Sequence, residues 1–151
     1  MKHPKAWFPS AAWMVVIFLM SAASGNISGE QSGLIVRMIL AVHGVFFGNT
    51  PLAPETIDLI HTFVRKAAHM SEYAVLALLY LYALCKNEAK RPLRTALLLC
   101  ALYAATDEIH QAFVPDRSPS PIDVMIDTAG AGVGLTLARL TALLRSSKPT
   151  T

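Results

Sequence analysis

The residues from 65 to 73 place basic, acidic, histidine and tyrosine side chains in one largely apolar stretch. Arg65, His69 and Glu72 stand at i, i+4 and i+7, so they share one face of a helix. A histidine titrates near neutral pH, and His69 oriented by a carboxylate could act as a general base. Two other interpretations stay open: His69 and Glu72 as metal ligands, or His69 as a structural histidine whose hydrogen bonds are satisfied.

Two carboxylates and an amide follow in a second apolar stretch, as DEIHQ. The adjacent Asp107 and Glu108 could share a proton or bind a cation, because two close carboxylates resist joint ionisation. Gln111 lies one helical turn after Asp107, and a solvated helix end is the alternative for Glu108. The next loop, VPDRSPSP, carries Arg117. Its guanidinium suits a phosphate or a carboxylate, with simple exposure to water as the alternative.

A third stretch places aspartates and glycines on one stripe. Asp123, Asp127, Gly130 and Gly134 recur at intervals of three and four residues. The two glycines form a small-xxx-small pattern, which lets a neighbouring helix approach closely. We therefore expect both aspartates to point into a helical bundle.

Composition indicates the solvent in which such a bundle would fold. Apolar residues make up 54% of the 151 residues and charged residues only 15%, whereas a soluble domain has about 25% charged residues. The mean hydropathy is +0.45. Four segments approach the roughly 20 residues that a helix needs to cross a bilayer, namely 7–23, 67–85, 92–114 and 122–144. The prediction is an all-α polytopic membrane protein, with residues 1–151 as one domain and about four transmembrane helices.

The first span and the region after it allow alternatives. Lys2 and Lys5 before a short apolar stretch and SAASG also resemble a cleavable signal peptide. Between the first two spans, apolar residues at helical spacing predict an amphipathic helix in the membrane interface, although a lid packed on the bundle fits equally. The stripe consists of Leu34, Ile35, Met38, Ile39, Val42 and Phe46.

The net charge and the cysteines exclude other classes of protein. A charge of +3, with no basic run interleaved with aromatic residues, gives no sign of a nucleic-acid partner. Cys85 and Cys100 each lie in an apolar stretch without metal-ligand spacing. We expect both to be buried thiols.

Basic residues predict the orientation. Lys2 and Lys5 precede the first span, residues 86–94 hold a group of lysines and arginines, and Arg145 and Lys148 follow the last span. With four crossings all these segments fall on one side, which the positive-inside rule makes cytoplasmic, together with both termini. The ionisable groups of spans two, three and four then reach one depth near the outer surface.

An ion-pair network that only fixes helix register would explain the same residues. Arg65, Lys66 and Arg117 would then neutralise some of the carboxylates, because an ionisable group at the membrane centre costs at least about 2.5 kcal/mol. However, carboxylates outnumber these cations, and two histidines lie among them. This favours a functional site with room for a proton, a metal ion or a cationic group.

The segments RKAAHMSEYAVL (65–76) and DEIHQAFVPDRSPSPIDVMIDTAGAGVG (107–134) resemble the VanZ-like family of bacterial membrane proteins. The family is named for a teicoplanin-resistance protein, and WMVVIFLMSAASG in the first span is a weaker match. The family pattern falls on Arg65, Lys66, His69, Glu72, Tyr73, Asp107, Glu108, Gln111, Pro115, Arg117, Asp123, Asp127 and Gly130. The family often has asparagine at the position of Asp127, which argues against a role that needs a neutral amide there.

The resemblance implies a multi-pass cell-envelope protein, with low-level teicoplanin resistance in the founding case, and implies no settled reaction, cofactor or metal. Our leading hypothesis is a site for an amphiphilic envelope molecule, such as a lipid headgroup or a lipid-linked wall component. Cationic side chains would hold its anionic group, and carboxylates its polar or cationic parts. The expected ligand-binding residues are Arg65, Lys66, Tyr73, Gln111, Arg117, Asp123 and Asp127.

Two further hypotheses belong to other classes. In a membrane-embedded hydrolase or transferase, His69 would be the general base oriented by Glu72, with Asp107 or Glu108 as acid or metal ligand. A proton-coupled transporter of a small solute would use the acidic pair as a relay. The transporter ranks last, because few polar residues continue into the inner half of the predicted bundle.

Overall fold

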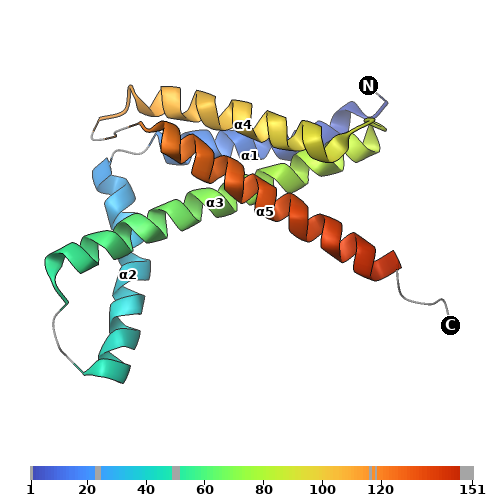
Figure 1. The fold of residues 1–151 in the computed structure, drawn as a ribbon. Coiled ribbons are helices and arrows are strands. Elements are labelled where there is room, and N and C mark those ends of the chain that lie inside the picture. The colour runs from blue at the N-terminus through green and yellow to red at the C-terminus, as the bar shows by residue number, and fades with distance from the viewer. Residues whose placement is uncertain (1, 23–24, 49–51, 116, 118, 147–151) are drawn as a thin grey trace.

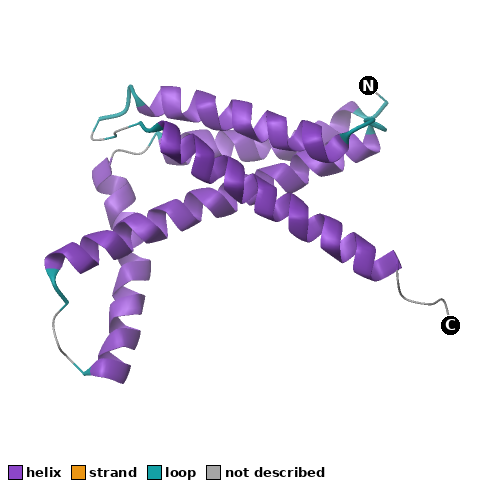
Figure 2. Cartoon of the chain, in the orientation of Figure 1, coloured by secondary structure: helices purple, strands orange, loops and turns teal. Residues whose placement is uncertain are grey.

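The computed structural model describes residues 2–22, 25–48, 52–115, 117 and 119–146, and over 25–32 it describes the backbone only. Lys148, one of the basic residues used for orientation, lies outside this part. The described residues form helices, turns and loops without a strand (Figure 2). The elements in chain order are η1 (Pro4–Trp7), α1 (Phe8–Ser21), α2 (Gly25–Phe47), α3 (Pro54–Lys86), α4 (Pro92–Gln111) and α5 (Pro121–Ser146). The all-α prediction is confirmed.

Prolines define the starts of the three helices that carry the chemistry. Pro54, Pro92 and Pro121 are the first residues of α3, α4 and α5. Proline suits this position because its fixed φ matches the helix and its missing N–H would have had no partner there. The α4–α5 loop spans residues 112–120. It brings the C-terminal end of α4 beside the N-terminal end of α5 (Figure 1).

α3 is the central element of the fold. It contacts η1, α1, α2, α4 and α5, and α5 crosses it in the middle of Figure 1. The inward face of α3 is fully buried at Tyr73, Leu76 and Ala77. The core continues into α1 through Ile17 and into α4 through Cys100.

The crossing of α3 and α5 depends on two glycines. A Cβ on Gly130 would lie 2.3 Å from the backbone oxygen of Met70, and one on Gly134 would lie 2.9 Å from that of Ala74. Both distances are too short for a real side chain. The close approach predicted from the small-xxx-small pattern is confirmed, with α3 as the partner helix.

The helices differ in how well they fit a bilayer. Within the described part of the chain, α3 is the one helix that is both long and apolar enough to cross a membrane, judged by length and composition. α1 has 14 residues, fewer than the roughly 20 that a crossing needs. Each of the four predicted spans coincides largely with a helix in the described residues, whereas the number of crossings stays a prediction.

α2 stands apart from the other helices. Among the described residues it packs on α3 alone, and it runs across the direction of α1 and α4 (Figure 1). Val36 is buried, but the predicted apolar stripe faces outwards, with Leu34 and Met38 respectively 65% and 63% exposed. An amphipathic helix in this region is therefore present, and its stripe does not pack on the bundle as a lid.

The prediction for the cysteines is half right. Cys100 is fully buried in the core, whereas Cys85 is exposed. Cys85 lies in the last turn of α3 on the side opposite to the core, where the apolar character of the sequence says nothing about which way a side chain points.

Candidate functional site

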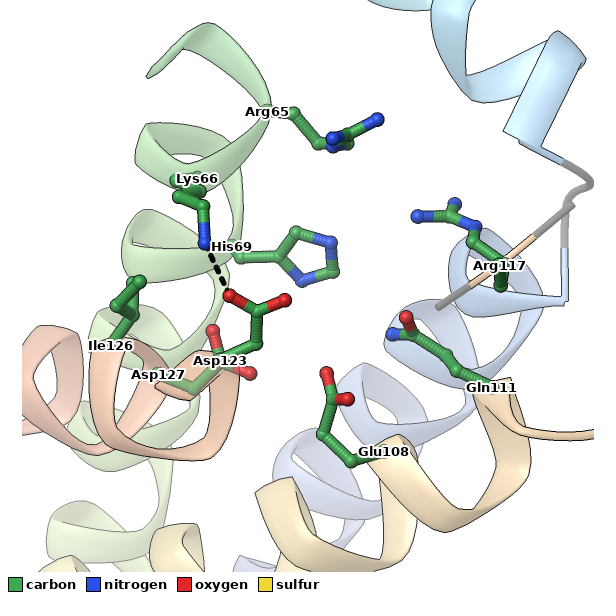
Figure 3. A pocket seen from close by; sticks show the side chains of 9 residues that line it. All are labelled: Arg65, Lys66, His69, Glu108, Gln111, Arg117, Asp123, Ile126 and Asp127. Atoms are coloured by element: carbon green, nitrogen blue, oxygen red, sulfur yellow. Dashed lines mark hydrogen bonds and ion pairs between the residues drawn. The ribbon is translucent and has the colours of Figure 1, made fainter. Parts of the chain in front are cut away.

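A small polar pocket of about 80 Å³ opens where α3, α4, α5 and the α4–α5 loop meet. Figure 3 shows that its side chains point toward one another from all four segments. The lining consists of Arg65, Lys66, His69, Glu108, Gln111, Arg117, Asp123, Ile126 and Asp127. Side chains more than 60 residues apart in the sequence thus come together, whereas their common depth near the outer surface of a membrane stays a prediction.

The pocket has a cationic rim. The guanidinium groups of Arg65 and Arg117 extend toward each other from opposite sides of the opening (Figure 3). Arg117 lies in the α4–α5 loop, and burial followed by the charge of Arg65 lowers its pKa from the usual value. Arg117 is partly buried and Arg65 is exposed. Two guanidinium groups that face each other repel, so an anion between them would relieve this repulsion.

One ion pair crosses the pocket. Lys66 Nζ binds Asp123 Oδ1, with both side chains about one third exposed. This pair joins α3 to the first turn of α5. The ion-pair explanation of the charged residues therefore holds for Lys66 and Asp123.

The floor of the pocket is acidic and buried. Asp127 is 2% exposed and lines the pocket, and Asp107, 3% exposed, lies close to it. The Oδ1 atom of each aspartate and Nδ1 of His69 are buried without a hydrogen-bond partner in the described part of the chain. His69 Nδ1 lies 3.8 Å from Glu72 Oε2, within ion-pair distance if the histidine is protonated, whereas neither aspartate Oδ1 has a hydrogen bond that would account for its burial.

Asp107 is oriented by its other oxygen. Its Oδ2 accepts hydrogen bonds from Ser21 Oγ at 2.8 Å and from Gln111 Nε2 at 3.2 Å. Gln111 also donates to Ser21 Oγ, at 3.2 Å. The last turn of α1 and the last turn of α4 thus hold the carboxylate in one orientation.

Glu108 turns away from Asp107 and holds the loop. Its Oε2 accepts a hydrogen bond of 2.7 Å from the backbone N–H of Ser120, just before α5 begins. Glu108 is only 7% exposed, so the alternative of a solvated helix end is wrong. The reason is the short α4–α5 loop, which folds back over the end of α4.

Three of the predicted site residues do not line the pocket: Glu72, Tyr73 and Asp107. Glu72 Oε2 lies 3.8 Å from His69 Nδ1, too far for a hydrogen bond. Tyr73 is completely buried, with its ring centroid 6.2 Å from that of Tyr103. Asp107 does not line the pocket itself but lies close to His69 and Asp127, which do.

Ser21 was not among the site residues expected from the sequence, yet its hydroxyl binds Asp107. The signal was present, because Ser10, Ile17 and Ser21 fall on one helical face and all three are buried. A buried serine at the end of an apolar helix indicates a polar partner on a neighbouring helix. His110, in contrast, is an ionisable residue of α4 that does not line the pocket. Its ring lies against that of Phe18 of α1 in a tilted arrangement, with ring centroids 4.2 Å apart.

Comparison with known proteins gives one match. The family model described as VanZ/LLP1 matches residues 6–144, which include every residue of the pocket. No curated protein and no solved structure matches the chain.

Proposed function

The chain belongs to the VanZ/LLP1 family, and from this premise we propose that its pocket binds the anionic headgroup of an amphiphilic envelope molecule at the outer surface of the cytoplasmic membrane. The observation that carries the proposal is the convergence of Arg65 and Arg117 over the opening of the pocket (Figure 3). Guanidinium groups present planar sets of donors that match phosphate and carboxylate oxygens. Lys66 already pairs with Asp123, so we assign the anion to the two facing guanidinium groups (Figure 3) rather than to the lysine.

The size of the pocket indicates what part of a ligand enters it. Pockets for drug-sized molecules measure about 300–1,000 Å³, whereas this one measures about 80 Å³. A phosphate or carboxylate group fits such a space, and a complete glycopeptide does not. The rest of the ligand would lie outside the pocket, along the surface of the protein and in the lipid.

Exposed apolar side chains support a membrane around the bundle. Phe8 and Leu19 of α1, Leu102 of α4 and Leu137 of α5 are each more than half exposed. In water, large exposed apolar patches are rare on a monomeric protein. In lipid they are the expected surface, and the outward stripe of α2 would lie in the membrane interface.

The ends of the helices support the proposed orientation. Lys2 Nζ lies 2.5 Å from Glu88 Oε2, and the backbone N–H of His3 donates to Asn87 Oδ1 at 2.9 Å. The basic N-terminal segment therefore lies beside the basic α3–α4 loop, at the end of the bundle opposite to the pocket (Figure 1). The positive-inside rule would make that end cytoplasmic and the pocket outward-facing.

Binding of anionic lipid tests the proposal. The protein in detergent would be titrated with phosphatidylglycerol and, separately, with phosphatidylcholine, and bound lipid would be counted by native mass spectrometry. We expect preference for the anionic lipid, and a loss of about tenfold to a hundredfold in affinity for Arg65→Gln with Arg117→Gln, because a charge-assisted hydrogen bond contributes about 1.5–3 kcal/mol.

A matched control uses basic residues at the other end of the bundle. Arg91→Gln with Arg94→Gln removes the same charge from the α3–α4 loop region and should leave affinity unchanged. Equal affinity of the pocket variant and the loop variant would overturn the proposal. A teicoplanin susceptibility assay in a sensitive host, with the same two variants, would then show whether resistance depends on this pocket.

A second candidate function is a membrane-embedded hydrolase or transferase that acts on the bound molecule. The observation in its favour is that His69 lines the pocket with a buried Nδ1 that has no partner in the described residues. Such a nitrogen is free to accept a proton from water or from a substrate hydroxyl. Turnover of a radiolabelled lipid extract that is lost in His69→Gln, with lipid binding retained, would support this function over simple binding.

A further inference from the structure

The floor of the pocket brings together ligand atoms from three helices. His69 of α3, Asp107 of α4 and Asp127 of α5 each offer one atom, and these atoms all lie within 4.8 Å of one another. Imidazole nitrogen and carboxylate oxygen are common metal ligands. Sequence spacing does not reveal this set, because the three residues are far apart in the chain.

Each of these three side chains also carries a buried polar atom that lacks a hydrogen-bond partner in the described part of the chain. Asp107 Oδ1, Asp127 Oδ1 and His69 Nδ1 are all buried and make no hydrogen bond to any described residue. Both aspartates are more than nine-tenths buried. About nine in ten buried polar groups in proteins have a partner, so three orphaned atoms of metal-ligand type at one place require an explanation.

We propose that His69, Asp107 and Asp127 bind one divalent transition-metal ion of the Zn²⁺ or Mn²⁺ type. Two carboxylates and a neutral imidazole carry a charge of about −2, which a divalent ion would neutralise in the buried site. In a tetrahedral site with metal–ligand distances of about 2.1 Å, the ligand atoms lie about 3.4 Å apart, so the three side chains would need to close by up to about 1.4 Å.

The donor set argues against other ions. Ca²⁺ takes 6–8 oxygen ligands, and Cu(I) and iron–sulfur clusters prefer cysteine or methionine sulfur. One nitrogen with two carboxylate oxygens suits borderline divalent ions instead. Three protein ligands also leave a coordination position open, and His69 and Asp127 both border the pocket from which a further ligand would come.

The surroundings of Asp107 resemble the outer shell of a metal site. Ser21 and Gln111 donate to its Oδ2 and leave Oδ1 directed elsewhere. Hydrogen bonds of this kind fix the orientation of ligating carboxylates, and their loss weakens metal affinity by about 10–100-fold. Ser21 and Gln111 would therefore be positioning residues for the metal.

Metal binding to the full chain in detergent tests the proposal without any lipid. The chelator-treated protein would be titrated with Zn²⁺ and with Mn²⁺ by calorimetry, and bound metal would be counted by mass spectrometry. We expect about one ion per chain, and an affinity loss of at least about 100-fold for Asp127→Asn, which exceeds the effect of an outer-shell change. Ser21→Ala should lose about tenfold.

Asp58→Asn is the control. It removes an exposed carboxylate of α3 that lies three helical turns before His69 and outside both the pocket and the cluster. This variant should keep about one ion per chain with little change in affinity. Equal losses for Asp58→Asn and Asp127→Asn would overturn the proposal, as would a wild-type protein that binds neither ion.

Variants that fail to fold would be recognised by the melting temperature, and His69→Gln gives a second measurement of the same ligand set. Loss of metal binding in the pocket-floor variants, with lipid binding intact, would separate this site from the proposed headgroup site. Loss of lipid binding in the variant with Arg65→Gln and Arg117→Gln, with metal binding retained, would likewise show that the two sites are separate.

Discussion

The glycine contacts between α3 and α5 lead to a prediction whose size follows from the structure. A Cβ at Gly130 would lie 2.3 Å from Met70 O, so α5 must move outwards by about 1 Å to reach an ordinary contact distance. Overpacking of this kind destabilises by about 1–3 kcal/mol. Alanine recovers up to about 1 kcal/mol of helix propensity. The added Cβ would clash with three backbone atoms of Met70, so the cost lies at the upper end, and about 3 kcal/mol less about 1 kcal/mol gives an expected net loss of about 2 kcal/mol for Gly130→Ala.

Gly132 provides the matched control within the same helix. A Cβ there meets nothing within 4 Å, so Gly132→Ala should be neutral or stabilising by up to about 1 kcal/mol. Gly134→Ala, whose Cβ would lie 2.9 Å from Ala74 O, should fall between the two. Only the position of the added methyl group differs among these variants.

The assay is thermal unfolding of the purified protein in detergent, followed by circular dichroism. For a chain of this length 1 kcal/mol corresponds to about 2–4 °C, so Gly130→Ala should melt about 4–8 °C below the wild type. Gly132→Ala should melt at or slightly above it. Indistinguishable melting temperatures for Gly130→Ala and Gly132→Ala would refute the helix crossing described here.

Further predictions concern the site, the topology and the thiols. Ser21→Ala removes a hydrogen bond to a buried carboxylate, worth about 2 kcal/mol, and should lower the melting temperature by about 4–8 °C; no shift would mean that the bond contributes nothing. Single cysteines at positions 90 and 117 would be introduced into a cysteine-free chain and treated with an impermeant maleimide. Lys90→Cys should react from the cytoplasm and Arg117→Cys from outside. Reaction of both cysteines from the same side of the membrane would contradict four crossings. In the folded wild-type protein, maleimide should modify Cys85 and leave Cys100 unreacted until denaturant is added, because only Cys85 is exposed.

Sequence reasoning predicted those features that depend on one helix at a time. The stripe of Asp127 and Gly130 faces the bundle because helical periodicity alone fixes which residues share a face. The same argument placed Arg65 and His69 together, and both line the pocket. Each of these predictions needed no knowledge of which helix would be the neighbour.

Features that depend on the identity of the neighbouring helix could not be predicted from the sequence. Asp107 and Glu108 are adjacent, so on a helix they point about 100° apart. In the structure Asp107 faces Ser21 of α1 and Glu108 faces the backbone of Ser120. Periodicity predicts the angle between the two carboxylates, but only the packing of α1 and the path of the loop decide the role of each.

The small size of the pocket makes the neighbouring helix α2 relevant to ligand binding. A pocket of about 80 Å³ would hold only the charged end of an amphiphile, so specificity for the remainder would have to come from a neighbouring apolar surface. α2 supplies one: its exposed stripe includes Leu34 and Met38, and its N-terminal end lies on the Arg117 side of the opening (Figure 3). A ligand bound by its headgroup between the arginines would therefore have an apolar surface close by for its chain. Polar substitution of that stripe should weaken binding of long-chain anionic lipids while leaving short-chain analogues unaffected, because only the long chains would reach α2.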